Sequence, residues 1–439
     1  MTDNFRKVLI IAYYFPPMGL SGVQRTVKFA KYLSRYGWKP SVLTVEPTGY
    51  YAFDESLLKE VEEAGVPVIR THSLDANHLF KRKSVVKMPS EWLRKLLQFF
   101  GDFFFIPDTK IGWKSYAIKA AKEHLAKEHF DLVFATAPPQ TAFLIGSALK
   151  KKFGLPLVLD YRDAWLDYPF KYFPTPVHRF LHKRLEKKVL KAGDKVVVTH
   201  RRVKEGLLKR YPTLSYHDVT IISHGYDPED LAGGSAEKKS RLNKMRIAHA
   251  GTFYGKRTPT VLLHALANLL KARQELRGRI ELSFVGTVRK EDQALVSKLG
   301  LQNDVVFHGY LEHRECVRQL LAADVLWYVV DNDYQSPGKL YEYFGARKPI
   351  FASVVEGYTR QLILESEAAV CVGLEDTAAH EQALFDLISQ FDEKKLKRPS
   401  EGFASKFNRA TLTGELAKQF ESLMDYDKNA FVLVREKPE

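Results

Sequence analysis

The sequence predicts an α/β protein built from two doubly wound, Rossmann-like domains. Apolar runs suited to buried strands alternate with helical segments along most of the 439 residues. A chain of this length usually needs more than one hydrophobic core. The polar, glycine-containing stretch 223–244 divides the alternation into two series and is the best linker candidate. We therefore expect domains over 1–230 and 231–403, followed by a helix and tail over 404–439.

Each series contributes its own set of elements. Strands of the first are predicted at 6–15, 39–45, 131–136, 156–160, 195–200 and 219–222, with a helix at 22–36. Strands of the second are predicted at 245–250, 280–286, 304–309, 324–330, 348–354 and 368–373, and helices near 258–275, 290–299, 312–322, 336–346, 357–366, 377–391 and 404–424. Such sheets are mostly parallel and bind ligands beyond the carboxyl ends of their strands, so we expect the site in those loops and in a cleft between the domains.

Charge is uneven along the chain. Residues 1–230 hold 37 Lys and Arg against 24 Asp and Glu, whereas residues 231–439 hold 30 against 28. The first part is therefore expected to face an anionic partner: a membrane surface, nucleic acid or a phosphorylated substrate. Nucleic acid is the weakest of these, because no recognition motif accompanies the charge, and we expect no nucleic-acid partner. A solvated basic surface without a partner is the alternative.

The N-terminal apolar run is too short for a secretory signal or a membrane span, which favours a cytoplasmic protein without a transmembrane helix. Cys316 and Cys371 lie in apolar surroundings and are predicted to be buried thiols, since neither metal nor disulfide spacing is available.

The loop after the first strand, 15–25, combines two prolines with Gly19 and Gly22 and runs into a helix. A glycine-rich turn at a helix N-terminus suits an anion, because unpaired N–H groups and the helix dipole point there. Gln24 and Arg25, in the first helical turn, are candidates to reach an acceptor or a phosphate. The alternative is a plain strand-to-helix turn, because neither a dinucleotide fingerprint nor a P-loop is present.

Arg162 and Asp163 directly follow an apolar strand, so they are expected at the carboxyl edge of the first sheet. Such a pair can bind substrate hydroxyls or transfer protons. The alternative is a buried structural salt bridge.

Two loops of the second domain carry candidate anion sites. After Gly251 and Thr252, the cations Lys256 and Arg257 precede a helix that we expect to begin with Thr258 as cap and Pro259 in its first turn, an arrangement suited to a diphosphate. The second loop, in 331–344, leads into a helix.

In that second loop, Ser336 is the predicted cap and Pro337 is expected in the first turn. Position 339, where a capping box would place an acid, is a lysine. Glu342 lies deeper and could accept hydrogen bonds from a ribose diol. A solvated helix glutamate is the alternative.

Taken in order, the segments "YYFPPMGLSGVQR", "DYRDAW", "AGTFYGKR", "VVFHGYLEHRECVRQLLAADVL" and "SPGKLYEYFGARKPIFAS" resemble the GT-B fold glycosyltransferases of family 4 over nearly the whole chain. The resemblance implies an acceptor-binding first domain, a second domain that binds a nucleoside diphosphate sugar, and a final helix that crosses back to the first. It implies donor contacts from nine residues, here Gly22, Gly251, Thr252, Lys256, Arg257, Gly338, Lys339, Leu340 and Glu342.

Glu342 matches the second glutamate of the family's E-x7-E motif, which typically holds the ribose, whereas Tyr334 stands where the first would be. That departure concerns the predicted donor sugar and mechanism, and leaves the predicted ribose contact unchanged. No clear counterpart of the catalytic-loop histidine of some members occurs in 136–142, so Arg162 and Asp163 are the nearest reactive pair.

The resemblance implies transfer of a sugar, with retention, to an acceptor in cell-surface polysaccharide or glycolipid assembly. No metal or other cofactor is expected, because the cations and the helix start can offset the charge that develops on the diphosphate. A nucleotide-sugar epimerase of the same fold and a non-catalytic, glycosyltransferase-like binding subunit are the alternatives.

Residues 81–120 contain nine Lys and Arg against three Asp and Glu. Within them, 91–108 interleaves cations with a tryptophan, leucines and phenylalanines, as suits the interface of an anionic bilayer. We expect this segment to bring the protein to a lipid-linked acceptor at the inner face of the membrane. The alternative is a helix whose aromatic face packs on the sheet.

Overall fold

A computed structural model describes residues 5–19, 21–48, 53–75, 91–232, 243–253, 255–335 and 337–435. The chain forms two compact units, Met1–Ser223 with Arg409–Glu439, and His224–Asn408. The second unit thus begins before the expected position 231 and ends after the expected position 403. These wider bounds arise because residues near the two ends of the unit bond to each other: the N–H of Tyr226 donates to the carbonyl of Phe407 at 2.9 Å.

The first unit holds a seven-stranded parallel sheet in the order β3-β2-β1-β4-β5-β6-β7. Its strands are β1 (Arg6–Ile11), β2 (Trp38–Val45), β3 (Val68–Thr71), β4 (Leu132–Ala137), β5 (Leu157–Tyr161), β6 (Lys195–Val198) and β7 (Val219–Ile221). Its helices are α1 (Ser21–Tyr32), α2 (Glu55–Glu63), α4 (Glu91–Phe104), α5 (Lys114–Leu125), α6 (Thr141–Phe153), α7 (Pro176–Ala192), α8 (Arg201–Arg210) and α17 (Arg409–Arg435).

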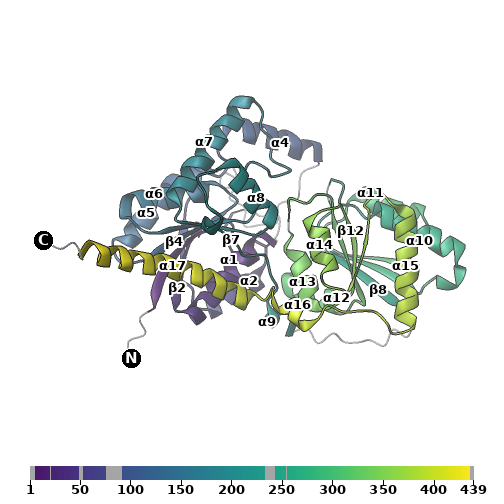
Figure 1. Ribbon diagram of the computed structural model, residues 1–439. Coiled ribbons are helices and arrows are strands. Elements are labelled where there is room, and N and C mark those ends of the chain that lie inside the picture. Colours follow the sequence, from purple (N-terminus) through teal and green to yellow (C-terminus); the bar gives the residue numbers. More distant parts are fainter. Residues whose placement is uncertain are drawn as a thin grey trace. The chain divides into compact units, whose positions relative to one another are not determined.

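Two cores sandwich this sheet because its central strands are apolar on both faces. Helices α1, α2 and α17 cover one face, and α5, α6, α7 and α8 cover the other. In α17, Leu412, Leu416 and Phe420 are buried on the first of these faces, and Phe420 packs edge-on against Trp38 (Figure 1).

The second unit repeats the plan with six strands in the order β10-β9-β8-β11-β12-β13, all parallel. Its strands are β8 (Met245–Ala250), β9 (Ile280–Val285), β10 (Val305–Gly309), β11 (Val325–Val330), β12 (Ile350–Val354) and β13 (Ala369–Val372). Its helices are α9 (Pro228–Ala232), α10 (Thr260–Ala272), α11 (Lys290–Lys298), α12 (His313–Leu321), α13 (Gly338–Ala346), α14 (Tyr358–Leu364), α15 (Thr377–Asp392) and α16 (Glu401–Ser405). Helices α10, α11 and α15 pack on one face, and α12, α13, α14 and α16 on the other.

Both sheets reverse their strand order at one point, between β1 and β4 in the first unit and between β8 and β11 in the second. Ligands of doubly wound sheets bind at such points, beyond the carboxyl ends of the strands. The α/β, twice doubly wound plan is therefore as the sequence predicts.

Several predicted boundaries differ from those observed. The strand expected at 6–15 stops at Ile11, and the edge strand β3 was not predicted because its four residues carry too short an apolar signal. The helix expected over 404–424 is two helices, since α16 ends at Ser405 and α17 begins at Arg409. Cys316 is buried as predicted, whereas Cys371 is half-buried.

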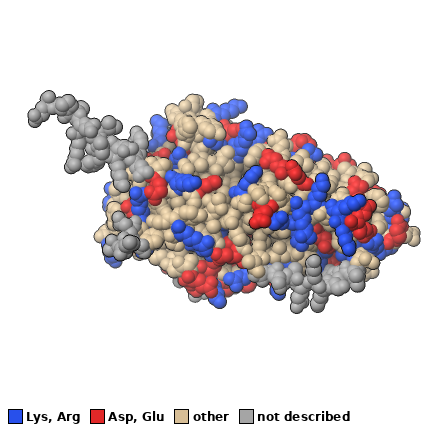
Figure 2. Space-filling view, turned by 60° about the horizontal axis from the view of Figure 1, so that its bottom comes forward, with Lys and Arg blue, Asp and Glu red and all other residues tan. Residues whose placement is uncertain are grey.

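Charges of both signs lie intermingled on the face shown in Figure 2, so the net charge of +15 does not form one uninterrupted basic patch there. Within the described ranges, no helix is long and apolar enough to cross a membrane.

Candidate functional site

The start of α13 leaves room for a ligand. Gly338 is the first residue of the helix, and a Cβ added to it would meet no atom within 4 Å. Pro337 is the residue before the helix rather than part of its first turn, and among the described residues no side chain caps this end. The predicted cap, Ser336, lies outside the described residues. Because the first N–H groups of a helix have no partner within it, this end can receive an anion.

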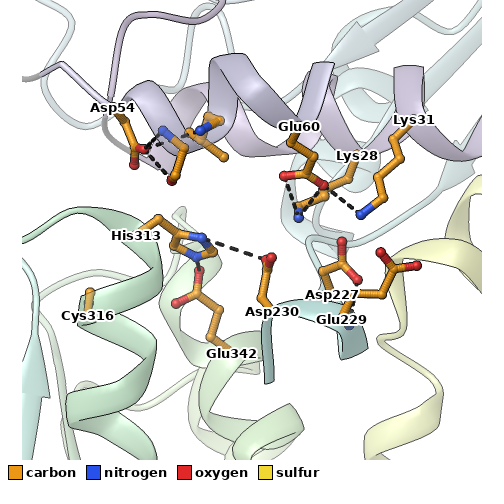
Figure 3. Close-up of polar contacts among 12 residues, drawn as sticks. Lys28, Lys31, Asp54, Glu60, Asp227, Glu229, Asp230, His313, Cys316 and Glu342 are labelled. Carbon is orange, nitrogen blue, oxygen red and sulfur yellow. Dashed lines mark hydrogen bonds and ion pairs between the residues drawn. The ribbon is translucent and has the colours of Figure 1, made fainter. Parts of the chain in front are cut away.

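A buried charged cluster lies one turn into α13. The Nζ of Lys339 is 2.9 Å from Oε2 of Glu342, and Nε2 of His313, on α12, is 3.4 Å from Oε1 of the same carboxylate. The Nδ1 of His313 in turn lies 3.7 Å from Oδ2 of Asp230, on α9. Figure 3 shows the imidazole of His313 between these two carboxylates, with Cys316 on the next turn of α12. Glu342 is therefore not the solvated glutamate considered as the alternative.

Two members of this cluster, Lys339 and Glu342, have shifted pKa values. Burial acts to raise the pKa of the Glu342 carboxyl, but Lys339 and His313 outweigh it and hold that pKa well below its usual range. Burial likewise acts to lower the pKa of Lys339, and the negative charge of its neighbours holds it above its usual range. Glu342 is thus a carboxylate that can only accept hydrogen bonds, which suits the diol of a ribose.

The loop after β8 is held against α13 and the neighbouring strand. The N–H of Ala250 donates to the hydroxyl of Tyr343 at 2.9 Å. A Cβ on Gly251 would lie 2.9 Å from Nε2 of His249, and one on Gly286 would lie 2.1 Å from the carbonyl oxygen of Gly251. Both glycines therefore allow close packing, and Thr252, directly after Gly251, is half-buried.

The two predicted phosphate-binding cations differ in exposure. Lys256 is 77% exposed at its side chain and pairs with Glu375 at 3.3 Å. Arg257 is buried, with Nε donating to Oδ1 of Asp331 at 2.9 Å and Nη2 donating to Gln335. Lys256 is thus available to a ligand, whereas Arg257 joins the loops that follow β8 and β11. Helix α10 begins at Thr260 rather than near 258, so Pro259 precedes it, and Thr258 accepts the N–H of Thr260 at 3.3 Å.

The triplet Asp331, Asn332 and Asp333 shapes its own loop. Asp331 holds Arg257, Asn332 accepts the N–H groups of Tyr334 and Gln335 at 3.1 Å, and Asp333 accepts the N–H of Thr359 at 2.9 Å. Each of the three side chains therefore has a hydrogen-bond partner within the protein. The side chain of Tyr334 is half-exposed beside them.

A pocket of about 290 Å³ lies at the carboxyl ends of β11, β12 and β13. Lys256, Arg289, Ser353 and His380 are among its polar lining residues, and Trp327 and Val329 are among the apolar ones. It adjoins the cation of the β8 loop, so the pocket lies at the same edge of the sheet as the candidate site. Leu340, in contrast, is fully buried in the core and offers a ligand no side-chain surface.

In the first unit, Arg25 is not available to a ligand. Its side chain is 1% exposed, and its Nη2 lies 2.8 Å from Oδ1 of Asp160, which is equally buried. Its Nη1 donates to the carbonyl of Ser223 at 2.8 Å. Asp160 also accepts the hydroxyl of Thr136 at 2.7 Å, so the ion pair joins α1 to β4 and β5. Arg25 was predicted as a ligand contact because the sequence does not reveal this partner 135 positions away.

Arg162 also donates its hydrogen bonds to the protein. Its Nη1 donates to the carbonyl of Gly22 and its Nη2 to that of Pro138, and its side chain is buried. Burial lowers the pKa of its guanidinium, and Asp160 and Asp163 oppose that effect. These contacts favour a structural role, in which Arg162 positions the loops that follow β1 and β4. A salt bridge alone, the alternative considered from sequence, does not describe these backbone contacts.

The other first-unit candidates are placed differently. Gly22 is exposed at the start of α1, whereas Gly19 and Gln24 are buried. Asp163 is half-buried beside Arg162. Of this group, Gly22 is the exposed member at a helix start, and its carbonyl accepts Nη1 of Arg162.

His313, Asp230 and Cys316 were not singled out from the sequence as site residues. His313 and Cys316 are three positions apart in a helix, a spacing that places them on one face, but nothing in the sequence gives that face its neighbour.

Comparison with known proteins agrees with this architecture. Residues 20–230 match the family model described as Glycosyltransferase Family 4, and residues 235–401 match the one described as Glycosyl transferases group 1. The chain is a family 4-like glycosyltransferase of the GT-B fold. None of the curated proteins compared with this glycosyltransferase matches it significantly.

Solved structures resemble the glycosyltransferase over nearly all of its length. HepE of Anabaena, in complex with UDP and glucose, has a TM-score of 0.64 at 15% identity, covering 95% of this chain and 100% of its own. Sucrose-phosphate synthase of Thermosynechococcus elongatus has a TM-score of 0.64 at 17% identity, covering 96% and 100%. WaaG, a glycosyltransferase involved in lipopolysaccharide biosynthesis, has a TM-score of 0.55 at 16% identity, covering 94% and 99%. At these identities the likeness concerns the fold.

Proposed function

We propose that this glycosyltransferase moves a hexosyl group from a nucleoside diphosphate sugar to a lipid-linked or saccharide acceptor, with retention at the anomeric carbon. The reaction would serve cell-surface polysaccharide or glycolipid assembly, on the cytoplasmic side. One observation carries the proposal: the open start of α13, where no side chain of the described residues caps the helix, lies one turn from the ionised pair of Lys339 and Glu342. The HepE complex with UDP and glucose supports trying uridine donors first.

Each group at this end of α13 has a role in the proposed reaction. The difficult step is departure of the diphosphate, on which negative charge accumulates. Lys256 and the N–H groups at Gly338 would stabilise that charge, because preorganised cations and helix N-termini act where charge develops. Glu342 would accept the ribose hydroxyls, and His313 and Lys339 would hold its orientation. Arg257, tied to Asp331, would keep the β8 loop in place.

The test is release of nucleoside diphosphate from a panel of donor sugars, with and without acceptor lipid, and nuclear magnetic resonance of the product's anomeric proton. We expect acceptor-dependent release from at least one donor and an anomeric configuration that matches the donor. Interconversion of the donor sugar without acceptor would instead indicate an epimerase. Binding of a donor without release of nucleoside diphosphate, with or without acceptor, would indicate a non-catalytic binding subunit.

Two variants connect the reaction to the site. Lys256→Ala and Glu342→Gln are expected to lower kcat/KM by about tenfold or more, the effect of losing one good charge-assisted contact of about 1.5–3 kcal/mol. Glu365→Ala, an exposed glutamate on the α14 side of the same unit, and Lys298→Ala, an exposed lysine on α11, are the matched controls. Equal activity in all four variants would contradict the proposed site.

A further inference from the structure

Helix α4 turns its apolar side chains outward. Seven large apolar side chains of this helix are exposed, namely Trp92, Leu96, Leu97, Phe99, Phe100, Phe103 and Phe104, and Phe105 directly after it is exposed as well. Trp92 and Phe104 are 68% and 67% exposed. A helix that packs on a sheet buries such residues, so the aromatic face of α4 is not the core face considered as the alternative. Soluble surfaces rarely present so many contiguous apolar side chains without a partner.

Among the described residues, polar contacts help to attach α4 to its unit. Gln98 donates to the carbonyl of Phe170 at 2.7 Å, and Asp102 accepts Lys171 at 2.6 Å. A Cβ on Gly101 would lie 2.8 Å from Thr109, so the helix approaches its unit closely at that point. These contacts fix one edge of α4 and leave its apolar face directed away from the sheet.

Helix α7 extends the same surface. It lies beside α4 in the first unit (Figure 1). The ring centroids of Phe103, on α4, and His178, on α7, are 5.2 Å apart, and the carbonyl oxygen of Phe103 lies 3.0 Å from Nε2 of His178. The first turns of α7 expose Val177, Phe180 and Leu181. At helical spacing the same stripe continues through Arg184 and Lys188, which are also exposed.

We propose that α4 and the exposed stripe of α7 form one docking surface for an anionic lipid bilayer. The surface comprises Trp92, Leu96, Leu97, Phe99, Phe100, Phe103, Phe104, Val177, Phe180 and Leu181, with Arg184 and Lys188 beside it. Aromatic and leucine side chains enter the boundary between headgroups and acyl chains, and the cations contact anionic headgroups. The prediction from sequence concerned residues 81–120 alone, of which 81–90 and the side chains of Leu93, Arg94 and Lys95 lie outside the described residues.

Charge favours a bilayer over a second copy of this chain as the occupant. Helix α7 carries six Lys and Arg and one glutamate, Glu186, which is buried. Two copies meeting through this surface would bring like charges together, whereas an anionic membrane neutralises them. The surface concerns membrane binding alone, so it can hold or fail independently of the sugar-transfer reaction.

Trp92 offers a direct test, because the other four tryptophans, Trp38, Trp113, Trp165 and Trp327, are buried. The full chain is titrated with vesicles of phosphatidylcholine, with and without phosphatidylglycerol, while tryptophan emission is recorded. We expect a blue shift, and quenching by bromine-labelled lipid, only with the anionic vesicles. Trp92→Phe should lose the optical signal but still sediment with the vesicles.

Variants separate the apolar from the charged contribution. The triple variant Leu97→Ser, Phe104→Ser and Phe180→Ser is expected to weaken vesicle binding by about tenfold or more at every salt concentration. The double variant Arg184→Glu and Lys188→Glu is expected to weaken binding by roughly fivefold per charge at low ionic strength, and less at high salt. Leu364→Ser and Lys298→Glu, exposed positions of the second unit, are the matched controls.

Thermal unfolding of each variant checks that the fold is retained, which these exposed positions should allow. Equal sedimentation of the wild type and the triple variant would overturn the proposal, as would no binding of the wild type to anionic vesicles. A blue shift that depends on protein concentration without lipid, together with a dimer in light scattering, would identify a second copy as the occupant and overturn it too.

Discussion

The half-buried Lys339 and the buried Glu342 form an ion pair, 2.9 Å long, across one turn at the start of α13. From sequence, both residues are predicted to contact the donor, Glu342 at its ribose. In the chain without ligand they neutralise each other, and His313 contributes from the other side. A donor would therefore enter a site whose charges are already ordered, and it would pay little to orient them.

Removing one partner of this pair should be more damaging than removing both. Lys339→Met is expected to lower the free energy of unfolding by about 3–5 kcal/mol, because it leaves the Glu342 carboxylate buried beside an apolar side chain. The double variant Lys339→Met with Glu342→Gln should recover much of that loss. Urea denaturation of the wild type, both single variants and the double variant gives the coupling energy. Additive losses would contradict a buried, coupled pair.

A substitution at Gly338 should lower donor affinity without lowering the free energy of unfolding. Because a Cβ at this position meets open space, Gly338→Ala should leave the unfolding free energy unchanged or raise it by up to about 1 kcal/mol. The added methyl group would occupy the space proposed for the diphosphate, so donor affinity should fall several-fold, measured by calorimetric titration. Gly402→Ala, at another glycine of the same unit with open space around it, should leave donor affinity unchanged. Equal donor affinity in the wild type and Gly338→Ala would move the diphosphate away from this helix start.

Arg25 is expected to matter for stability rather than for ligand binding. Arg25→Met leaves Asp160 buried without its partner and should lower the unfolding free energy by about 3–5 kcal/mol. Arg201→Met, an exposed arginine on α8, should change it by about 0.5 kcal/mol or less. Chemical denaturation of both variants, followed by donor titration of whatever remains folded, distinguishes the two roles. Unchanged stability with lost ligand binding would restore the role predicted from sequence.

Glu186 should make the stability of the first unit depend on pH. Burial raises the pKa of its carboxyl from 4.5 to about 7, although Tyr211 donates to it at 2.7 Å and Arg210 lies 3.8 Å away. A raised pKa means that the folded state holds this proton more tightly than the unfolded chain does. Its contribution to stability is therefore complete below pH 4.5 and declines as pH rises to about 7, by about 3 kcal/mol in all.

The variant Glu186→Gln removes this titration while keeping an acceptor for Tyr211. We expect its unfolding free energy to exceed that of the wild type increasingly between pH 5 and pH 8, measured by urea denaturation across that range. Glu123→Gln, an exposed position on α5, is the control and should parallel the wild type. A constant difference between Glu186→Gln and the wild type across this range would show that Glu186 does not titrate there.

Much of the fold could be predicted because its signals are local. Central parallel strands such as β4 and β11 are continuous apolar runs, and the polar stretch that begins at 223 marks the boundary between the units. The short edge strand β3 could not be predicted, because an edge position buries less and its apolar run is only partial.

The candidate site was predictable only in part. Gly338, Lys339, Lys256 and Glu342 lie at strand ends or helix starts, positions that the order of elements reveals. Whether a charged side chain faces a ligand or the protein depends on its neighbours in space. Like Lys256, Arg25 and Arg257 are cations near a helix start that follows a strand, yet both arginines are buried and paired.

By itself, then, the sequence determined the two-sheet plan, the family, and which loops lie at the carboxyl ends of the strands, because hydrophobic periodicity and chain order are enough to specify these. Only the tertiary structure decided which cations are paired and buried, that His313 completes the cluster at Glu342, and that α4 and α7 present one outward apolar surface. Those outcomes depend on contacts between residues far apart in the chain, and burial, not residue type, sets the free energy of each charge and each aromatic ring.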